Sequence, residues 1–261
     1  MTQTPQRTPV IRASQVSKTF AHDGLQQHIL INLDLEIAAG EYVVVMGPSG
    51  AGKSTLLHLL SGMDSPTLGE IVVDGRAIGG LDAKALTRFR RDHCGFVFQQ
   101  IHLLDALSVL DNVLAVGLLR GRRREVAPRA EALLGRVGIE PIDRGKFPAM
   151  LSGGEAQRVA VVRALINSPA VVFADEPTGQ LNSEASRSVL DLLGEVGAGG
   201  QTVLMVTHDL RSALRGDRVV YLRDGAAGAI RGECVLGRRT GEDRDDARLA
   251  RLTGFLDEMG W

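Results

Sequence analysis

Residues 47–54 read Gly-Pro-Ser-Gly-Ala-Gly-Lys-Ser and directly follow the mostly apolar run Glu-Tyr-Val-Val-Val-Met at 41–46. The spacing fits GxxxxGK[ST], and the pattern from Lys53 to Leu60 is helical. In a strand–loop–helix setting the glycines let backbone N–H groups turn towards phosphate oxygens, and the helix start adds a positive dipole end. We therefore expect a nucleotide's phosphates to be bound by Gly47, Pro48, Ser49, Gly50, Ala51, Gly52, Lys53, Ser54 and Thr55.

A second strand carries acidic residues that fit this loop. The run Val-Val-Phe-Ala-Asp-Glu at 171–176 is apolar and ends in two carboxylates. Lys53 would reach the β- and γ-phosphates, Ser54 and Asp175 would hold Mg²⁺, and Glu176 would be the base that polarises the attacking water. A chance Gly-rich turn and two solvated or helix-capping acids are the alternatives, and the paired motifs disfavour both.

The order of the other segments predicts an α/β fold. Strands are expected at 10–18, 28–37, 70–73, 94–98, 170–174, 202–206 and 218–222, with a turn at 22–24 and a helix at 183–196. Strands that alternate with helices predict a parallel sheet covered on both faces. Residues 100–167 have helical spacing and would form a lobe inserted into that core, and residues 242–258 read as a charged amphipathic helix or a loose tail.

Composition restricts the function. The chain of 261 residues has 44 % hydrophobic and 23 % charged residues, which is typical of a globular protein. Its net charge of −1 gives no reason to expect nucleic-acid binding. Cys94 and Cys234 lie far apart and suggest a reducing cytosol. Neither a membrane-spanning run nor a signal peptide is evident, so we expect a protein that serves a membrane, if at all, from the cytoplasm.

The stretch Leu151-Ser-Gly-Gly-Glu-Ala-Gln-Arg-Val-Ala160 separates this chain from other phosphate-loop proteins. Ser152 followed by Glu155 is a capping box and places a helix start there. The stretch resembles the signature sequence of ABC ATPases, and the likeness covers roughly residues 10–225. It implies a P-loop NTPase core with a mostly parallel sheet, an N-terminal antiparallel β subdomain and an inserted α-helical lobe. We expect one ABC ATPase domain at 1–235 (core 1–99 and 168–235, lobe 100–167) and a charged helical tail at 236–261.

The resemblance also implies further site residues. Gln99 matches the glutamine that senses Mg²⁺ and links lobe to core, with Gln100 as a second choice. His208 matches the switch histidine on the γ-phosphate, and Phe20 the aromatic that stacks on adenine. A structural histidine and a core phenylalanine are the alternatives. Ser152, Gly153, Gly154 and Asn182 would reach the ATP of a partner subunit across a dimer interface.

Asn182 departs from the family pattern, because this loop commonly ends in Asp. The change could weaken interface coupling or slow hydrolysis. Gln180 and Ala156 are milder departures. Lys53, Asp175, Glu176 and His208 are all retained, so the resemblance implies a competent ATPase rather than a degenerate subunit.

The runs 95–104 and 175–182 are similar to the branch with lipoprotein-release, macrolide-export and cell-division ATPases. This implies a motor that binds ATP and Mg²⁺, pairs with a second ATP-binding subunit, either an identical chain or a paralogue, and drives separate integral membrane permease subunits from the cytoplasmic face of the membrane. Export or extraction of a lipoprotein, peptide or drug-like molecule is the first hypothesis. Transmembrane signalling without transport is the alternative, and a soluble DNA-repair or translation ATPase is disfavoured.

Two surface hypotheses remain open. Residues 101–110 would contact the membrane partner, or else pack in the core. The arginines at 120 and 122–124 would face anionic lipid, or else lie at a solvated helix end.

Overall fold

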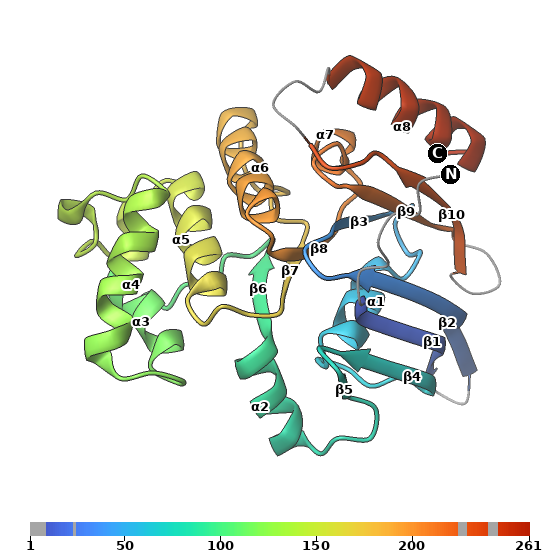
Figure 1. The fold of residues 1–261 in the computed structure, drawn as a ribbon, viewed down its shortest axis with the longest axis horizontal. Helices are drawn as coiled ribbons and strands as arrows, with labels where there is room; N and C mark the ends of the chain where they lie inside the picture. Colours follow the sequence, from blue (N-terminus) through green and yellow to red (C-terminus); the bar gives the residue numbers. More distant parts are fainter. Residues whose placement is uncertain (1–8, 23–24, 224–228, 240–244) are drawn as a thin grey trace.

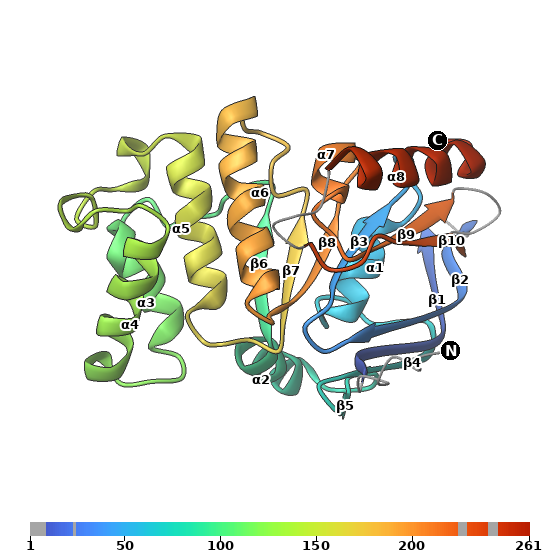
Figure 2. The ribbon, with the colours of Figure 1, turned by 45° about the horizontal axis from the view of Figure 1, so that its top comes forward.

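The structure is a computed structural model that describes residues 9–22, 25–223, 229–239 and 245–261 (Figure 1). The first eight residues, most of the turn predicted at 22–24 and the first residues of the helix predicted at 242–258 lie outside this range. Two sheets lie next to each other, and a helical lobe extends from the far edge of the larger one (Figures 1 and 2).

The larger sheet has the strand order β10-β9-β3-β8-β7-β6. The five strands from β9 to β6 are parallel, and β10 is antiparallel to β9 at the edge. β3 and β8 are buried along their whole length, as expected for parallel strands covered on both faces. Because the strands are parallel, the carboxyl ends of β3, β7 and β8 meet at one edge. The strands are β3 (Tyr42–Met46), β6 (Cys94–Phe98), β7 (Val171–Asp175), β8 (Thr202–Val206), β9 (Arg218–Arg223) and β10 (Ala229–Val235).

The smaller sheet is the predicted N-terminal antiparallel subdomain, with the order β2-β1-β4-β5. Its inward-facing residues, such as Ile11, Leu33 and Ile71, share one buried cluster with the helix that follows the phosphate loop. This packing connects the small sheet to the loop. The strands are β1 (Pro9–His22), β2 (Leu25–Ala38), β4 (Leu68–Val73) and β5 (Arg76–Ala77).

Helices lie against the faces of the larger sheet, and the last one packs against its β10 edge (Figure 2). Leu252 and Leu256 of this C-terminal helix are buried, so the tail is a helix and the loose-tail alternative is wrong. Arg248 of the same helix is 6 % exposed and donates hydrogen bonds of 2.7–3.3 Å to the carbonyl groups of residues 214, 216, 236 and 237. The helices are α1 (Lys53–Leu60), α2 (Ala83–His93), α6 (Ser183–Ala198), α7 (Leu210–Ala213) and α8 (Asp245–Met259).

The predicted lobe is helical, and its third helix belongs to two cores. Val159 and Val162 of α5 pack into the lobe, whereas Val161 and Ala164 pack into the cluster beside the larger sheet. α5 therefore joins lobe and core mechanically. The lobe consists of α3 (Val109–Gly117), α4 (Arg123–Arg136), α5 (Gly153–Leu165) and short 3-10 turns at Pro141–Asp143 and Pro148–Met150.

Four elements were absent from the sequence expectations, among them the four-residue helix α7. α2 is a mostly polar helix that buries only Phe89. β10 is an edge strand whose residues are mostly exposed or half-buried, and β5 has two residues. Elements with little buried surface leave a weak hydrophobic pattern.

Candidate functional site

The phosphate loop connects β3 to α1 and has the backbone that the glycines allow. Gly47 has a φ of 151°, and a Cβ there would overlap the carbonyl oxygen of Leu222. Gly52 has a φ of 87° and precedes α1 without any side-chain cap, and the first turn of α1 carries no acidic residue. The amides at the start of α1 are therefore available to an anion. Ser49 and Gly50 lie at the exposed tip, and Ala51 is buried beneath it.

Lys53 lies over this loop rather than in solvent. Its Nζ donates 2.8 Å hydrogen bonds to the carbonyl oxygens of Gly47 and Pro48. Partial burial lowers the pKa of the Lys53 ammonium, and the nearby carboxylates of Glu176 and Asp175 oppose that shift. The ammonium is thus held beside the site where the amides would bind phosphate.

Asp175 and Ser54 meet at the carboxyl edge of the sheet. The Ser54 hydroxyl donates to Asp175 Oδ1 at 3.1 Å, although the two residues are 121 positions apart in sequence. Desolvation raises the pKa of Asp175, and the Ser54 hydrogen bond opposes this. A hydroxyl and one carboxylate are the hard oxygen ligands that Mg²⁺ takes beside nucleotide phosphates, so the residues fit the metal. The described residues contain no cluster of three or more His, Cys, Asp or Glu that could hold a metal alone.

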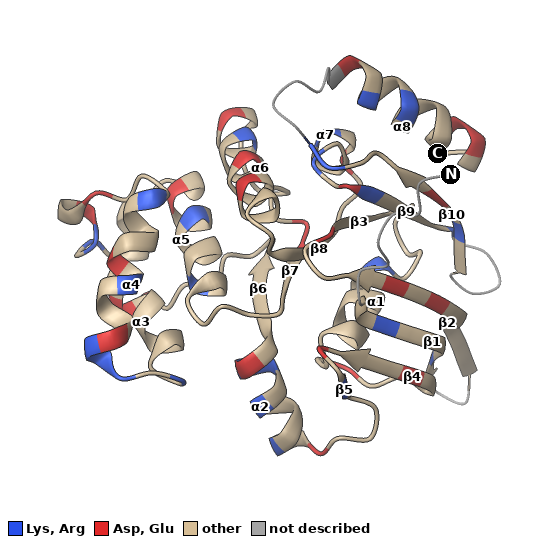
Figure 3. Ribbon diagram, in the orientation of Figure 1, with Lys and Arg blue, Asp and Glu red and all other residues tan. Residues whose placement is uncertain are grey.

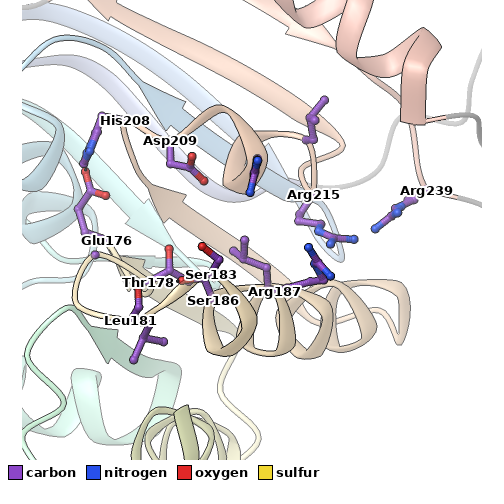
Figure 4. A pocket seen from close by; sticks show the side chains of 14 residues that line it. Glu176, Thr178, Leu181, Ser183, Ser186, Arg187, His208, Asp209, Arg215 and Arg239 are labelled. Carbon is purple, nitrogen blue, oxygen red and sulfur yellow. Dashed lines mark hydrogen bonds and ion pairs between the residues drawn. The ribbon is translucent and has the colours of Figure 1, made fainter. Parts of the chain in front are cut away.

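Glu176 is fixed by its backbone and by both carboxylate oxygens. Its φ of 44° lies in the left-handed region, which is costly for a non-glycine residue, and its N–H donates to Val206 O at 3.0 Å. Oε1 accepts from His208 Nδ1 at 2.8 Å, and Oε2 accepts from the Thr207 hydroxyl at 3.1 Å. The ionised carboxylate only accepts, so Nδ1 carries a proton, and Nε2 of the exposed imidazole has no hydrogen-bond partner among the described residues. Glu176 and His208 form one unit, labelled at the left of Figure 4.

Gln99 also reaches this edge. It follows β6, and a Cβ on Gly179 would lie 2.8 Å from its Nε2. Its amide therefore lies against the loop that begins with Glu176. Gln100 is exposed, and no such approach is seen for it.

The signature stretch begins α5, as expected, but this helix start lies away from the phosphate loop. The Ser152 hydroxyl accepts from Glu155 N at 3.3 Å, and Glu155 Oε2 accepts from Ser152 N at 2.7 Å, which completes the capping box. The Ser152 hydroxyl also donates to Glu155 Oε2 at 2.6 Å, and this bond, together with the one from Ser152 N, lowers the pKa of Glu155. Ser152, Gly153 and Gly154 line a hollow with residues 180–182 that includes none of residues 47–55. One subunit thus brings together Lys53, Ser54, Asp175, Glu176, His208 and Gln99, but not Ser152.

Asn182 and Phe20 lie at the margins. Asn182 is the N-cap of α6, where its Oδ1 accepts from Ala185 N at 2.9 Å. Phe20 is 45 % exposed near the end of β1, with Lys18 Nζ 4.8 Å from its ring centroid. The core alternative for Phe20 is wrong, and an exposed ring is free to stack on a base.

Three contributing residues were not predicted. Thr207 orients Glu176, and Gln157 Nε2 of α5 donates to Phe98 O at 3.0 Å, directly before Gln99. Asn112 is 2 % exposed and bonds the backbone of residues 104, 107 and 108, which orders the segment after Gln99. A buried polar residue within an apolar helical face was the available signal for Gln157 and Asn112, whereas Thr207 had none.

The residues of the two surface hypotheses, 101–110 and the arginines at 120 and 122–124, differ in how exposed they are. Within 101–110, Val109 is buried and Leu103 is half-buried against the lobe core, whereas Leu104 is 56 % exposed. Arg120 donates to the carbonyl oxygens of Asp92 and Asn167. The arginines at 122–124 are exposed at the start of α4, the blue lower end of that helix in Figure 3.

The fold and site define a phosphate-loop nucleotide hydrolase with a preformed carboxylate–histidine pair. The sequence profile described as ABC transporter matches residues 30–179. The chain belongs to the ABC transporter family, as its ATP-hydrolysing cassette.

Two macrolide export ATP-binding/permease proteins illustrate the similarity. MacB of Escherichia coli is 42 % identical over 249 residues, which is 95 % of this chain and 38 % of that protein. MacB 1 of Aeromonas hydrophila is 43 % identical over 226 residues, 86 % of this chain and 35 % of that protein. The chain therefore spans less than two fifths of the length of these curated relatives. The predicted placement in the macrolide and lipoprotein branch is confirmed.

Solved structures agree. The dimeric structure of MJ0796, a bacterial ABC transporter cassette, has a TM-score of 0.77 and 39 % identity, covering 85 % of this chain and 97 % of that one. The same cassette bound to ADP and Pi in a post-hydrolysis state also has a TM-score of 0.77, with 38 % identity and the same coverage. These likenesses confirm the fold class. Among the described residues, no helix is long and apolar enough to cross a membrane.

Proposed function

We propose that this cassette pairs head to tail with a second ATP-binding subunit, and that each signature closes over the ATP held by the other's phosphate loop. The supporting observation is the division of the site. Lys53, Asp175, Glu176 and His208 lie together, whereas Ser152 begins α5 elsewhere, at the positive end of that helix's dipole. Two-fold pairing would bring the phosphate loop of each subunit to the signature of the other, which gives two complete sites per dimer.

Within each site, residues would have separate tasks. Amides of the phosphate loop and Lys53 would bind the β- and γ-phosphates, and Phe20 would stack on the base. Ser54, Asp175 and Gln99 would hold Mg²⁺, which when bound neutralises charge on the phosphates. Glu176 would orient the attacking water, and His208 would donate from Nε2 to a γ-phosphate oxygen, which requires the imidazole to carry both protons. Asn182, at the end of the loop that follows Glu176, would reach the site from the partner subunit.

The lobe at 100–167 would carry closure to membrane permease subunits, and the core at 1–99 and 168–235 would hold the nucleotide. Leu104 is the exposed apolar residue of the expected docking segment, so we place the permease contact there. The relatives are named as macrolide export ATP-binding/permease proteins. Export of a drug-like, peptide or lipoprotein substrate from the cytoplasmic face is therefore the proposed role.

The first experiment measures steady-state ATPase activity and gel filtration of wild type and Glu176→Gln with ATP and Mg²⁺. The variant is expected to bind ATP without cleaving it and to elute as a dimer. Glu140→Gln, at an exposed loop carboxylate, is the matched control and should behave as wild type. A Glu176→Gln variant that hydrolyses ATP normally would remove Glu176 from its role.

A mixing experiment tests the head-to-tail arrangement. Lys53→Ala inactivates the phosphate-loop half of the site. Ser152→Asp inactivates the signature half, because it keeps a good N-cap but places negative charge towards the partner's phosphate. Each variant alone should be inactive. Mixing them should restore part of the activity, because one of the two composite sites is then intact. No recovery from folded, dimerising variants would show that both halves act within one chain.

A further inference from the structure

A pocket of about 460 Å³ extends away from the Glu176–His208 pair between α6 and α7. Four arginines line it, and we call it the arginine pocket: Arg187, Arg211, Arg215 and Arg239. Figure 4 shows the guanidinium groups of Arg187, Arg215 and Arg239 turned towards one another at one end and the Glu176–His208 pair at the other. One continuous pocket thus joins the catalytic pair to a group of cations.

The acids of this pocket are already engaged. Asp209 caps α7, where its Oδ2 accepts from the N–H and the hydroxyl of Ser212, both at 2.7 Å. Glu176 accepts from His208 and Thr207. Neither carboxylate is paired with an arginine of the pocket, so neither neutralises that end.

The four arginines differ in whether they already have a hydrogen-bond or ion-pair partner. Arg215 forms an ion pair with Asp191 at 2.7 Å, and Arg239 also has an interaction partner. Arg187 and Arg211 are exposed and have no hydrogen-bond or ion-pair partner among the residues that the structure describes. They come from different helices, Arg187 from α6 and Arg211 from α7, and both line the pocket.

Hydroxyl groups lie between the two ends. Thr178, Ser183 and Ser186 line the pocket from the loop after Glu176 and from the first turns of α6 (Figure 4). Hydroxyls donate to anions as well as accepting from donors. The lining therefore offers polar contacts from the catalytic end to the arginine end.

We propose that the arginine pocket binds inorganic phosphate. The guanidinium fork matches phosphate oxygens in geometry and charge, and a phosphate ion fits easily in the volume. Phosphate could come from ATP cleaved next to Glu176 or from solution. The first source rests on the proposed catalytic role of Glu176, whereas binding from solution does not.

The binding arm measures the affinity of the nucleotide-free chain for inorganic phosphate by calorimetry at fixed ionic strength. Wild type is compared with Arg187→Gln/Arg211→Gln. The control, Arg123→Gln/Arg124→Gln, removes the same charge from the exposed start of α4. Because the phosphate loop is unchanged in both variants, its contribution is common to all three proteins. We expect the pocket variant to bind about tenfold more weakly than wild type and the control to match wild type.

The release arm uses single turnovers of ATP. Acid quench gives cleavage, and a fluorescent phosphate sensor gives release. A lag between cleavage and release that shortens in the pocket variant identifies the product as the source. Weakened binding with an unchanged lag identifies solution phosphate. If phosphate affinity is the same in wild type and pocket variant, the proposal is overturned whatever the lag. Failure of hydrolysis alone would count against the role of Glu176 and leave the binding result standing.

Discussion

Replacing Thr207 by valine tests whether the hydroxyl that contacts Glu176 is needed for catalysis. Thr207 is 1 % exposed, donates to Glu176 Oε2 at 3.1 Å and accepts from Asp209 N at 3.0 Å. Valine is close to threonine in size but carries no hydroxyl, so the substitution removes both hydrogen bonds. Among the described residues, His208 is then the one side chain still bonded to the Glu176 carboxylate.

The size of the effect follows from the two bonds. A hydrogen bond to a charged group contributes about 1.5–3 kcal/mol. If that is lost fully from the transition state, kcat/KM falls by about 10- to 150-fold. The unpaired Asp209 N–H adds a cost to folding of about 1 kcal/mol, because Asp209 is half-buried and water reaches part of its surroundings.

The assay pairs ATPase kinetics with urea unfolding. Thr207→Ser is the control, because it keeps the hydroxyl and loses one methyl group. It should retain most activity at a stability cost of about 1 kcal/mol. The reasoning is refuted if Thr207→Val retains wild-type kcat/KM, or if Thr207→Ser loses as much activity as valine does.

Three further predictions concern other parts of the molecule. Ser152→Ala breaks the capping box and should lower the free energy of unfolding by about 1 kcal/mol, whereas Ser152→Asn should keep it; urea unfolding decides. Arg248→Met removes hydrogen bonds to four carbonyl groups, one buried and three half-buried, and should lower the melting temperature by several degrees, since its cost is about 2–5 kcal/mol; an unchanged Tm would contradict the contact. Burial raises the pKa of Cys94 to about 12 and also raises that of Cys234, so at pH 8 both thiols stay protonated and should react with a thiol reagent only on unfolding; rapid labelling of the native chain would contradict this.

The sequence was most informative where function and local backbone chemistry coincide. The phosphate loop, the apolar strand before Asp175 and the capping box at Ser152 each carry a local pattern tied to one geometry. The structure then brings Ser54 within 3.1 Å of Asp175. That meeting could be anticipated, because both follow parallel strands whose carboxyl ends share an edge.

What the sequence could not provide is the support around these groups. Thr207 is one threonine after an apolar strand, and only the sheet register places it under Glu176. The left-handed backbone at Glu176 has no sequence mark, because it is a property of how β7 and β8 end together. The arginine pocket depends on residues of both α6 and α7, and no spacing along the chain encodes that. Long-range packing decides such features, and single-sequence patterns report only local ones.

The way in which α8 is attached has a consequence for comparing sequences. At residues 214, 216, 236 and 237, Arg248 contacts main-chain carbonyl groups, which every amino acid supplies. A substitution at any of these four positions leaves the acceptor in place, so the arginine needs no compensating partner there. Covariation between aligned positions would therefore miss this attachment, however many homologues were compared. Its trace would be an arginine that stays constant while the residues it touches drift.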